Sequence, residues 1–377
     1  TNLVTFSNTG SVTLGDAALD TLTFNGGITA TAPASKSIAG SIGTTNDNVN
    51  LGTSATTATA NATIIPGTGT LTLAAVTINS GVTLTLGAGA ATPITTGTVS
   101  GAAASGNLTI NTTAAVTVAA VAGPNMGTVT ITNSGGTTFS GGVTATTVTL
   151  TATTGTITFN GALVTSGNLD AAAAGFAVSF NAAVGGQAST VGGTAILLNT
   201  GLVSFGNDIA DSFTATGGLT HTAGPSDVVG SLSTTNTPLT LGNITIHAAT
   251  IIDSGTGALT LGNIVIDDGV TLLLGTGVAT MITVTGSISG TLLGAVSNLE
   301  FDTTGAVSVT GPVGVDLGTV TVTNSGSASF ASAVTATTVT LTATTGTVTF
   351  TGAVTAATLN VLAGVNNVAI LGSGTTI

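Results

Sequence analysis

Residues 127–159 read GTVTITNSGGTTFSGGVTATTVTLTATTGTITF, and residues 318–350 read GTVTVTNSGSASFASAVTATTVTLTATTGTVTF. Both stretches alternate Thr with Val, Ile, Leu or Phe, and this period of two is the pattern of β-strands. Their apolar residues recur about every 9 to 12 positions, and Asn-Ser-Gly at 133–135 and 324–326 supplies turns between them. The repeated stretch therefore predicts short β-strands joined by tight turns.

The match extends outward from this stretch over the whole chain. Leu-Thr-Leu at 71–73 returns at 259–261, and Asn-Thr-Gly at 8–10 returns at 199–201. The chain is therefore predicted to be a tandem duplication, with a first copy at residues 1–191 and a second copy at residues 192–377. No linker rich in proline or charge separates the copies, so we expect the second copy to continue directly from the first.

Two all-β architectures use short strands at this spacing. In a β-solenoid (β-helix) each strand stacks on its equivalent one coil later, whereas tandem β-sandwiches pair neighbouring strands as hairpins. The interval from Val129 to Val148 favours solenoid coils of about 19 to 20 residues. The chain has 11 Phe and neither Trp nor Tyr, which suits a thin solenoid core. We expect a β-solenoid, with tandem β-sandwich domains as the alternative. Helix signals are nearly absent, and the Ala run at residues 170–175 is the one segment that could form a turn of helix.

Composition excludes several classes of function. One Lys and no Arg stand against 13 Asp and Glu, giving a net charge of −12, so nothing could neutralise a row of phosphates and nucleic-acid binding is not expected. No run approaches 18 consecutive apolar residues, so no transmembrane segment is expected. The chain starts at Thr1 without Met, which predicts a processed, exported protein located outside the cell or on its outer surface.

Two acidic motifs bear on catalysis. The sequence IIDSG at 251–255 is similar to the aspartic-protease signature, but the first copy has Pro66 where the second has Asp253, and those enzymes need two carboxylates sharing one proton. Glu300 and Asp302 would share one face of a strand, as the acids of a β-helical polysaccharide hydrolase do. That spacing alone is common, and such a site usually also needs a nearby Lys or Arg, of which the chain has only Lys36. We therefore expect no enzyme, no catalytic residue and no bound cofactor.

Paired acids make a structural calcium ion the one metal to consider, because Ca²⁺ prefers oxygen ligands. The candidate ligands are Asp208, Asp211, Asp267 and Asp268. The Gly-Gly-x-Gly-x-Asp repeat of calcium-binding β-rolls is absent. His221 and His247 have no matching His, Cys or paired acids, so we expect surface or turn histidines.

Two tracts carry a family resemblance: residues 143–169, VTATTVTLTATTGTITFNGALVTSGNL, and residues 347–360, TVTFTGAVTAATLN. They resemble the passengers of filamentous-haemagglutinin-like adhesins and of large Gram-negative autotransporters. The resemblance lies in the Thr/Gly/Val pattern and a rhythm of about 19 residues, and it covers most of the chain. It implies a right-handed β-helix, export, and adhesion to or coating of a cell surface.

Neither end of the sequence carries the charged cap that usually closes a solenoid. Open ends favour stacking, and a head-to-tail contact that does not close produces a filament. Lys36 aligns with Asp227 at the offset of 191, so this pair would set the register if copies packed side by side. The predicted assembly interface comprises Thr1, Asn2, Leu3, Val4, Gly374, Thr375, Thr376 and Ile377.

The expected function is a non-enzymatic extracellular structural protein that self-assembles head to tail into a filament or surface coat, with adhesion included. One alternative is a glycan- or ice-binding module, because Thr149 with Thr151 and Thr340 with Thr342 could form ordered ranks of hydroxyls. The other alternative is an autotransporter passenger fragment. The expected partners are further copies of the chain and host or environmental glycans.

Overall fold

The computed structural model describes residues 2–102, 105–123, 126–183, 185–292 and 294–377. Within these ranges there is no helix, and the strands pair in parallel over about 17 stacked turns. This arrangement is a β-solenoid. The predicted β-solenoid is thus confirmed, and tandem sandwiches are excluded because their neighbouring strands pair antiparallel.

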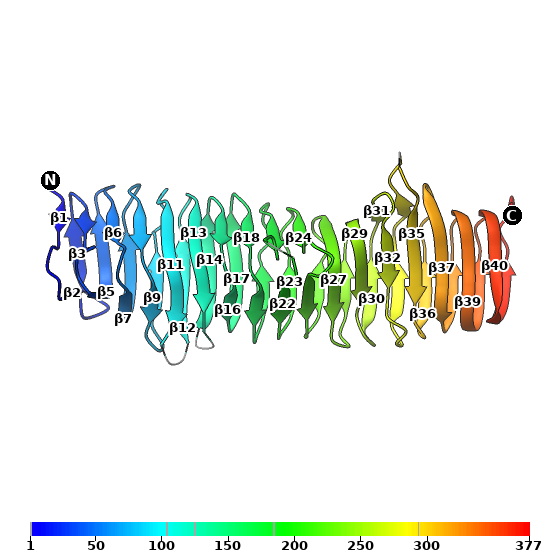
Figure 1. The fold of residues 1–377 in the computed structure, drawn as a ribbon, viewed down its shortest axis with the longest axis horizontal. Coiled ribbons are helices and arrows are strands. Elements are labelled where there is room, and N and C mark those ends of the chain that lie inside the picture. The colour runs from blue at the N-terminus through cyan, green and yellow to red at the C-terminus, as the bar shows by residue number, and fades with distance from the viewer. Residues whose placement is uncertain (1, 103–104, 124–125, 184, 293) are drawn as a thin grey trace. The chain divides into compact units, whose positions relative to one another are not determined.

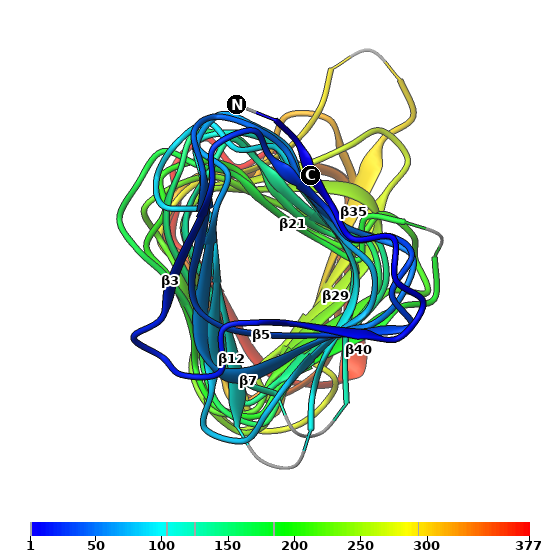
Figure 2. The same ribbon diagram turned by 90° about the vertical axis from the view of Figure 1, so that its left-hand side faces the viewer.

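The chain divides into two compact units, Thr1–Ala183 with Asn199–Gly201 (unit 1) and Val184–Leu198 with Leu202–Ile377 (unit 2). Within each unit, successive strands lie side by side as neighbouring coils (Figure 1). Each coil contributes strand segments to three walls, here called A, B and C, and Figure 2 shows strands such as β5, β7 and β12 following one another in these walls. The letters are defined within each unit, and walls of the two units that are equivalent in the duplication share a letter. The duplication boundary at residue 191 stays a prediction about the sequence.

In unit 1 the long strands β5 (Ser35–Thr44) and β7 (Thr56–Ile65) run from wall C into wall A, and β11 (Ile94–Gly101) and β13 (Val116–Ala122) run from wall B into wall C. Wall A also contains β3 (Thr21–Phe24), β10 (Thr83–Leu86), β12 (Gly106–Asn111), β14 (Met126–Ser134), β17 (Thr147–Thr153) and β20 (Leu169–Ala171). Wall B also contains β1 (Val4–Thr5), β4 (Ile28–Thr29), β6 (Val49–Leu51), β8 (Leu71–Leu73), β15 (Thr137–Phe139), β18 (Ile157–Phe159) and β21 (Val178–Phe180). Wall C also contains β2 (Ser11–Leu14), β9 (Val76–Ile78), β16 (Val143–Ala145) and β19 (Leu163–Thr165).

In unit 2 the strands β27 (Ser226–Thr234) and β29 (Ile244–Asp253) run from wall C into wall A, while β39 (Val334–Phe350) and β40 (Val354–Ile370) pass through all three walls. Wall A also contains β22 (Ala188–Val191), β25 (Ser212–Ala215), β32 (Thr271–Leu274), β35 (Ser297–Asp302) and β37 (Leu317–Ser325). Wall B also contains β23 (Ala195–Leu197), β26 (Leu219–His221), β28 (Leu239–Leu241), β30 (Ala258–Leu261), β33 (Met281–Val284), β36 (Ala306–Val309) and β38 (Ser327–Phe330). Wall C also contains β24 (Val203–Phe205), β31 (Ile264–Ile266) and β34 (Ile288–Gly290).

Coil length varies more than the sequence rhythm predicts. Val148 pairs with Val129, as the rhythm of the repeated stretch predicts. Leu299 pairs with Leu272 across a longer stretch of chain, because the intervening coil carries longer corner loops. The Ala run at 170–175 forms no turn of helix: Leu169 lies in strand β20 and pairs with Val148, since burying an apolar side chain in the ladder outweighs the helix propensity of the following Ala run.

Alternation of inward and outward side chains builds the core. In β18, Ile157 and Phe159 are buried while Thr158 between them points outward, and the other strands repeat this pattern. Identical ladder positions stack similar side chains: in wall B the ring centroid of Phe159 lies 5.1 Å from that of Phe139 and 5.3 Å from that of Phe180, and the rings of both pairs are stacked nearly parallel. Such stacking adds to the area buried, so the fold depends on the inward positions of each coil.

Replacing Phe159 by Ala should lower the free energy of unfolding by about 3 to 5 kcal/mol, because it removes a fully buried ring stacked on both sides. Chemical denaturation followed by far-UV circular dichroism measures the loss. The matched control is Thr158→Ala on the outer side of the same strand, which should change stability by about 0.5 kcal/mol or less. Equal losses for both variants would contradict the assignment of inward and outward positions.

Candidate functional site

The predicted assembly residues near the start of the chain lie on the first coil. Thr1 lies outside the described residues. Asn2, Leu3 and Val4 are exposed, and Val4 pairs with Ile28 of β4. Leu3 and Val4 are therefore apolar side chains open to solvent, at the edge of wall B.

The predicted residues 374–377 extend the ladder beyond β40. Thr376 forms a parallel bridge with Thr355, and its N–H donates to the carbonyl oxygen of Val354 at 2.8 Å. Ile377 next to it is exposed. This segment therefore lies against wall C of the last coil.

A second apolar feature of that coil was not predicted. Val361 and Ile370 of β40 occupy ladder positions that face the core, yet they are 47% and 38% exposed. Their ladder partners one coil earlier, Leu341 and Phe350, are 0% and 1% exposed because β40 covers them. We call the exposed, core-facing side chains of Val361 and Ile370 the β40 stripe.

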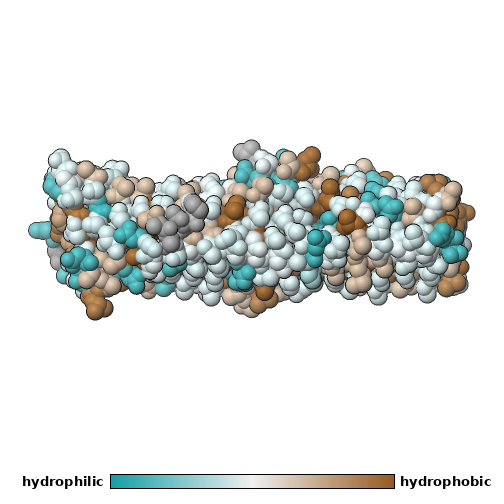
Figure 3. Space-filling view, turned by 90° about the horizontal axis from the view of Figure 1, so that it is seen from below, coloured by the Kyte–Doolittle hydropathy of each residue, from teal (hydrophilic) through white to brown (hydrophobic). Residues whose placement is uncertain are grey.

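Columns of hydroxyl groups cover the outer side of the walls. Most of the face in Figure 3 is pale, the colour of intermediate hydropathy, with strongly polar and apolar residues scattered over it. In wall A of unit 1, one column runs in register through five successive coils: Thr63, Thr85, Thr109, Thr130 and Thr149. In wall B a second column comprises Thr72, Thr95, Thr117, Thr138 and Thr158.

The predicted Thr ranks are only partly in these columns. Thr149 and Thr340 each have a Thr as ladder partner in the preceding coil. Thr151 and Thr342 instead donate their hydroxyl protons to backbone carbonyls of the preceding coil, at 3.2 and 3.0 Å. Half of each predicted rank therefore holds neighbouring coils together.

The acids Asp208 and Asp211 accept backbone hydrogen bonds from their own loop and, for Asp211, also from the preceding coil. The carboxylate of Asp211 accepts backbone N–H groups from Gln187 at 2.8 Å, Asn207 at 2.9 Å and Asp208 at 3.1 Å. One oxygen of Asp208 accepts the N–H of Ala210 at 2.9 Å. Both side chains therefore brace a corner loop.

Asp267 belongs to a chain of charges that crosses three coils. Nδ1 of His247 donates to Asp267 at 2.8 Å, and its Nε2 lies 3.3 Å from Asp227. The hydrogen bond to Asp267 is the main cause that raises the pKa of His247 above its ordinary value of 6.5; partial burial opposes the shift, and the charge of Asp227 adds to it. Asp268 instead accepts the hydroxyl proton of Thr291 at 2.5 Å.

Calcium binding by these acids stays a prediction. Asp208 and Asp211 share one loop, while Asp267 and Asp268 follow strand β31. In the ranges that the structure describes, no group of three or more His, Cys, Asp or Glu is placed to hold a metal ion. An ion at either pair would need backbone carbonyls or hydroxyls as further ligands.

The acids of the two motifs considered for catalysis, Asp253, Glu300 and Asp302, lie on the outer side of wall A. Glu300 and Asp302 alternate with buried residues of β35, so they share one side of the strand as expected. Asp302 accepts an amide proton from Asn324 at 2.7 Å, and Asp253 accepts the hydroxyl proton of Thr276 at 2.8 Å. Asp302 and Asp253 are thus each tied to a neighbouring coil.

The predicted alignment of Asp253 with Pro66 is wrong by one position. Gly43 pairs with Ile65 in unit 1, and the equivalent Ser233 pairs with Asp253 in unit 2. Asp253 therefore corresponds to Ile65, which is not an acid either.

His221 contradicts its prediction as a surface or turn residue. It is completely buried in wall B, with Nδ1 2.9 Å from the carbonyl oxygen of Leu197 and Nε2 3.2 Å from that of Pro225. A ring N–H that donates to one of these carbonyl oxygens gives the buried ring a partner at an inward position. His247 is exposed, as expected.

The predicted alignment of Lys36 with Asp227 is also wrong. Val12 pairs with Lys36 in unit 1, and the equivalent Val203 pairs with Ser226 in unit 2, so Lys36 corresponds to Ser226. Lys36 points inward, is buried and donates to the hydroxyl of Ser54, and this burial lowers its pKa. A contact between molecules cannot use this side chain.

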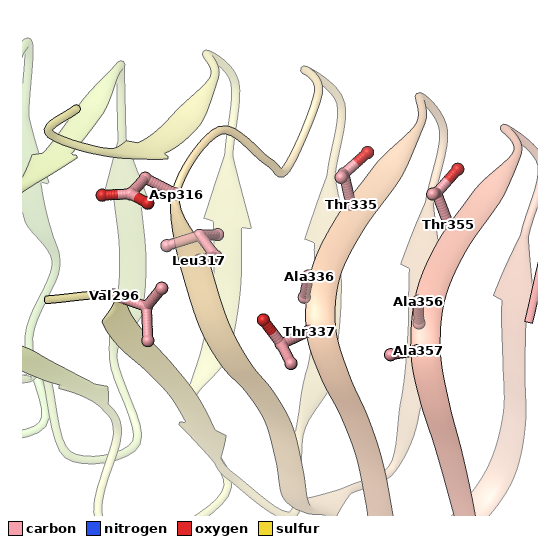
Figure 4. Close-up of a pocket in the computed structure, with 9 residues that line it drawn as sticks. All are labelled: Val296, Asp316, Leu317, Thr335, Ala336, Thr337, Thr355, Ala356 and Ala357. Atoms are coloured by element: carbon pink, nitrogen blue, oxygen red, sulfur yellow. The ribbon is translucent and has the colours of Figure 1, made fainter. Parts of the chain in front are cut away.

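A pocket of about 340 Å³ in unit 2 contains an acid that no sequence motif marked. Asp316, Thr335 and Thr355 line it, with their polar ends drawn in Figure 4. Val315 and Asp316 have φ angles of 59° and 57°, a left-handed conformation that is rare for residues other than Gly. One carboxylate oxygen of Asp316 is buried without a hydrogen-bond partner. Strain and an unpaired oxygen therefore coincide in this corner.

Comparison with known proteins adds no relative. No protein-family model, no curated protein and no solved structure matches the chain. The described part of the chain holds no helix that is both long and apolar enough to cross a membrane. The fold defines the class as a β-solenoid, and the arguments about function rest on the chain's own surface.

The pair of acids around His247 predicts a measurable titration. Proton NMR of the His247 ring should give a pKa above 6.5, and Asp267→Asn should lower it more than Asp227→Asn does. Because the pKa is raised in the folded chain, the stabilisation is fully present below the unfolded pKa near 6.5 and is lost as pH rises through the folded pKa. A pKa of His247 unchanged by Asp267→Asn would refute the hydrogen bond as its cause.

Proposed function

We propose that this protein is a non-enzymatic extracellular structural protein whose copies assemble head to tail into a filament or surface coat. The β40 stripe carries the proposal. Its side chains occupy ladder positions that are buried in β39, one coil earlier. Leaving aliphatic side chains in water is unfavourable, so covering the stripe supplies a driving force for association.

The first coil offers the complementary edge. Leu22 and Phe24 of β3 face the core but are only half-buried, whereas Ile42, the ladder partner of Leu22, is completely buried. A strand of one copy added to β40 of another would bury both sets and give partners to backbone groups at both edges. Because the ladder is parallel, such a contact joins two different surfaces and repeats without closing, which produces a filament.

Two further features support an exposed, extracellular setting. Lys36 is the chain's only Lys or Arg and it is buried, so the folded chain offers trypsin-like proteases no accessible basic residue. The Thr columns give the walls a polar surface that carries almost no charge. Adhesion to a surface, or a role as an autotransporter passenger, is compatible with the same features.

The wall A column of unit 1 favours a second candidate, a module that binds ice or glycan through ordered hydroxyls. Thr85, Thr109 and Thr130 are in register and half-buried, so their rotamers are restricted. Neighbouring coils repeat at about 4.8 Å, which gives a regular row of donors and acceptors. The column in unit 2 is interrupted by Ile251, Leu273 and Glu300, so this candidate rests on unit 1.

Charges placed on the β40 stripe should prevent assembly. The wild-type chain should form filaments in electron micrographs and elute at high mass in size-exclusion chromatography. The double variant Val361→Asp and Ile370→Asp should elute as a monomer, because burying an unpaired carboxylate in an apolar contact costs several kcal/mol.

Two outward-facing changes, Asn360→Asp and Thr358→Asp, are the matched control, since together they add the same two charges to the outer side of the same strand and should still allow filaments to form. A wild-type chain that stays monomeric at high concentration would remove the assembly proposal and leave the passenger fragment. Equal loss of filaments in the control would show that charge on the strand, rather than the stripe, decides the outcome.

The second candidate predicts thermal hysteresis, a gap between the melting and freezing temperatures of ice in the protein solution. Thr109→Lys should abolish the gap, because a long charged side chain disrupts the middle of the hydroxyl column. Thr321→Lys, at the corresponding wall of unit 2, should have no effect. The absence of hysteresis in the wild type would exclude ice and leave only glycan for this surface.

A further inference from the structure

Two grooves occupy equivalent places on wall A of the two units. In unit 1, a groove of about 300 Å³ lies between the loop at 15–20 and strands β5, β7 and β10. In unit 2, a groove of about 370 Å³ lies between the loop at 206–211 and strands β27, β29 and β32, with Glu300 of β35 also lining it. Neither groove was predicted from the sequence.

The strand register establishes the equivalence. The column beneath the first groove is Ser41, Thr63 and Thr85, and it continues to Thr109 in the next coil. The column beneath the second groove is Ser231, Ile251 and Leu273, and it continues to Glu300 in the next coil. The duplication has therefore kept the backbone of the groove and changed its lining.

The loop that walls each groove is held in the same way in both units. The side chain of Asp20 accepts the N–H groups of Asp16 and Ala17 at 2.8 and 3.0 Å, as Asp211 does for its own loop. The backbone carbonyl of Asp20 accepts the N–H of Ser41 at 2.7 Å. In unit 2 the backbone carbonyl of Asp211 accepts the N–H of Ser231, the equivalent of Ser41, at 2.9 Å. Both loops are therefore fixed to the strand below them.

A glycine at the bend of the strand makes this close approach possible. Gly40 and Gly230 have φ angles of 71° and 81°, which other residues rarely adopt. A Cβ atom would lie 2.3 Å from the carbonyl oxygen of Asp20 at the first position and 2.4 Å from that of Asp211 at the second. Both grooves are therefore formed by the fold before any ligand arrives.

The second groove is apolar where the first is polar. Ile209 and Ile251 are 65% and 40% exposed, and Leu273 between them and Glu300 is half-buried. The equivalent residues of unit 1 are Ala18, Thr63 and Thr85. Aliphatic side chains gathered in one preformed concavity, on a wall otherwise covered by hydroxyls, are typical of a binding site.

We propose that the groove of unit 2 binds a basic, apolar peptide segment of another protein. An aliphatic or aromatic side chain of that segment lies against Ile209, Ile251 and Leu273, and a neighbouring Lys or Arg pairs with the carboxylate of Glu300. This site is separate from the terminal coils, and it does not depend on how copies assemble.

Charge identifies the partner. Glu300 lines the groove, and Asp253 lies on the same outer side of β29 as Ile251, two residues further on. The chain has a net charge of −12, and its one Lys is buried in unit 1, so the matching cation has to come from another protein.

A second copy of this chain fits the groove poorly. Among the described residues, the most exposed aliphatic side chain is that of Leu19, at 95% exposure, in the loop that walls the first groove. Leu19 lies between Asp16 and Asp20, so inserting it would bring two carboxylates toward Glu300 and Asp253. Like charges at a contact oppose binding.

The first test uses a fluorescent peptide of alternating leucine and lysine, Leu-Lys-Leu-Lys-Leu, with the methyl groups of Ile and Leu labelled in the protein. Binding should shift the methyl NMR signals of Ile251 and Leu273. The double variant Ile251→Thr and Leu273→Thr, which installs the residues of the first groove, should bind at least about tenfold more weakly by fluorescence anisotropy. Its thermal unfolding should match the wild type, since both sites are on the outer wall.

Two matched variants separate the apolar and ionic parts. Glu300→Thr places in unit 2 the residue type that unit 1 has at the equivalent Thr109. This variant should bind the peptide about fivefold more weakly, and its binding should depend less on salt concentration. The reverse change in unit 1, Thr63→Ile with Thr85→Leu, should add a second, weaker site for the same peptide, which calorimetry detects as a rise in stoichiometry.

Equal binding by the wild type and the Ile251→Thr, Leu273→Thr variant would overturn the proposal, as would equal binding of a Leu-Glu-Leu-Glu-Leu peptide. No shift of the two methyl signals at millimolar peptide would do the same. If the wild type self-associates and the Ile251→Thr, Leu273→Thr variant does not, the groove binds a second copy instead. Variants of the β40 stripe would not change that self-association.

Discussion

The parallel ladder is the constraint on which the rest of this structure depends. Each residue of a coil lies directly beside its equivalent in the next coil, so an inward side chain must pack against the side chains before and after it. Phe139, Phe159 and Phe180 show the result, since three rings occupy one position in three coils. The last coil, β40, meets this constraint on one side only, and that is why Val361 and Ile370 are exposed.

The ladder explains what the sequence predicted well. Alternation of Thr with apolar residues fixes which side chains point inward, and recurrence after about 20 residues fixes which strands stack. His221 could have been placed by the same rule, because Leu219 and His221 alternate around Thr220 in a strand whose inner side is buried. The lack of a matching His, Cys or acid, on which the surface prediction rests, says nothing about burial, and the carbonyl groups of Leu197 and Pro225 that accommodate the ring are invisible in the sequence.

Other features could not be predicted because coil length is not constant. Val129 and Val148 pair at the interval that the sequence rhythm suggests, but Leu272 and Leu299 pair across a longer one. The residues that meet across coils therefore cannot be read from a fixed period. For this reason the alignment of Lys36 with Asp227 is wrong by one position. A shift of one residue along a strand matches the inward-facing Lys36 with the outward-facing Asp227. The grooves and the strained Asp316 depend on corner loops, and the contacts of His247 depend on which outward residues of neighbouring coils meet.

The two units show where this fold leaves room for function. Inward positions of equivalent strands carry similar residues, such as Leu84 in β10 and Leu272 in β32, because packing in the ladder restricts them. Outward neighbours are restricted much less: Thr85 corresponds to Leu273 with no change in register. A change of this kind alters the chemistry of a wall at little cost to the core. Specificity in a duplicated solenoid can therefore be set on its outer columns and exposed edges, while the stacked interior supplies a common frame.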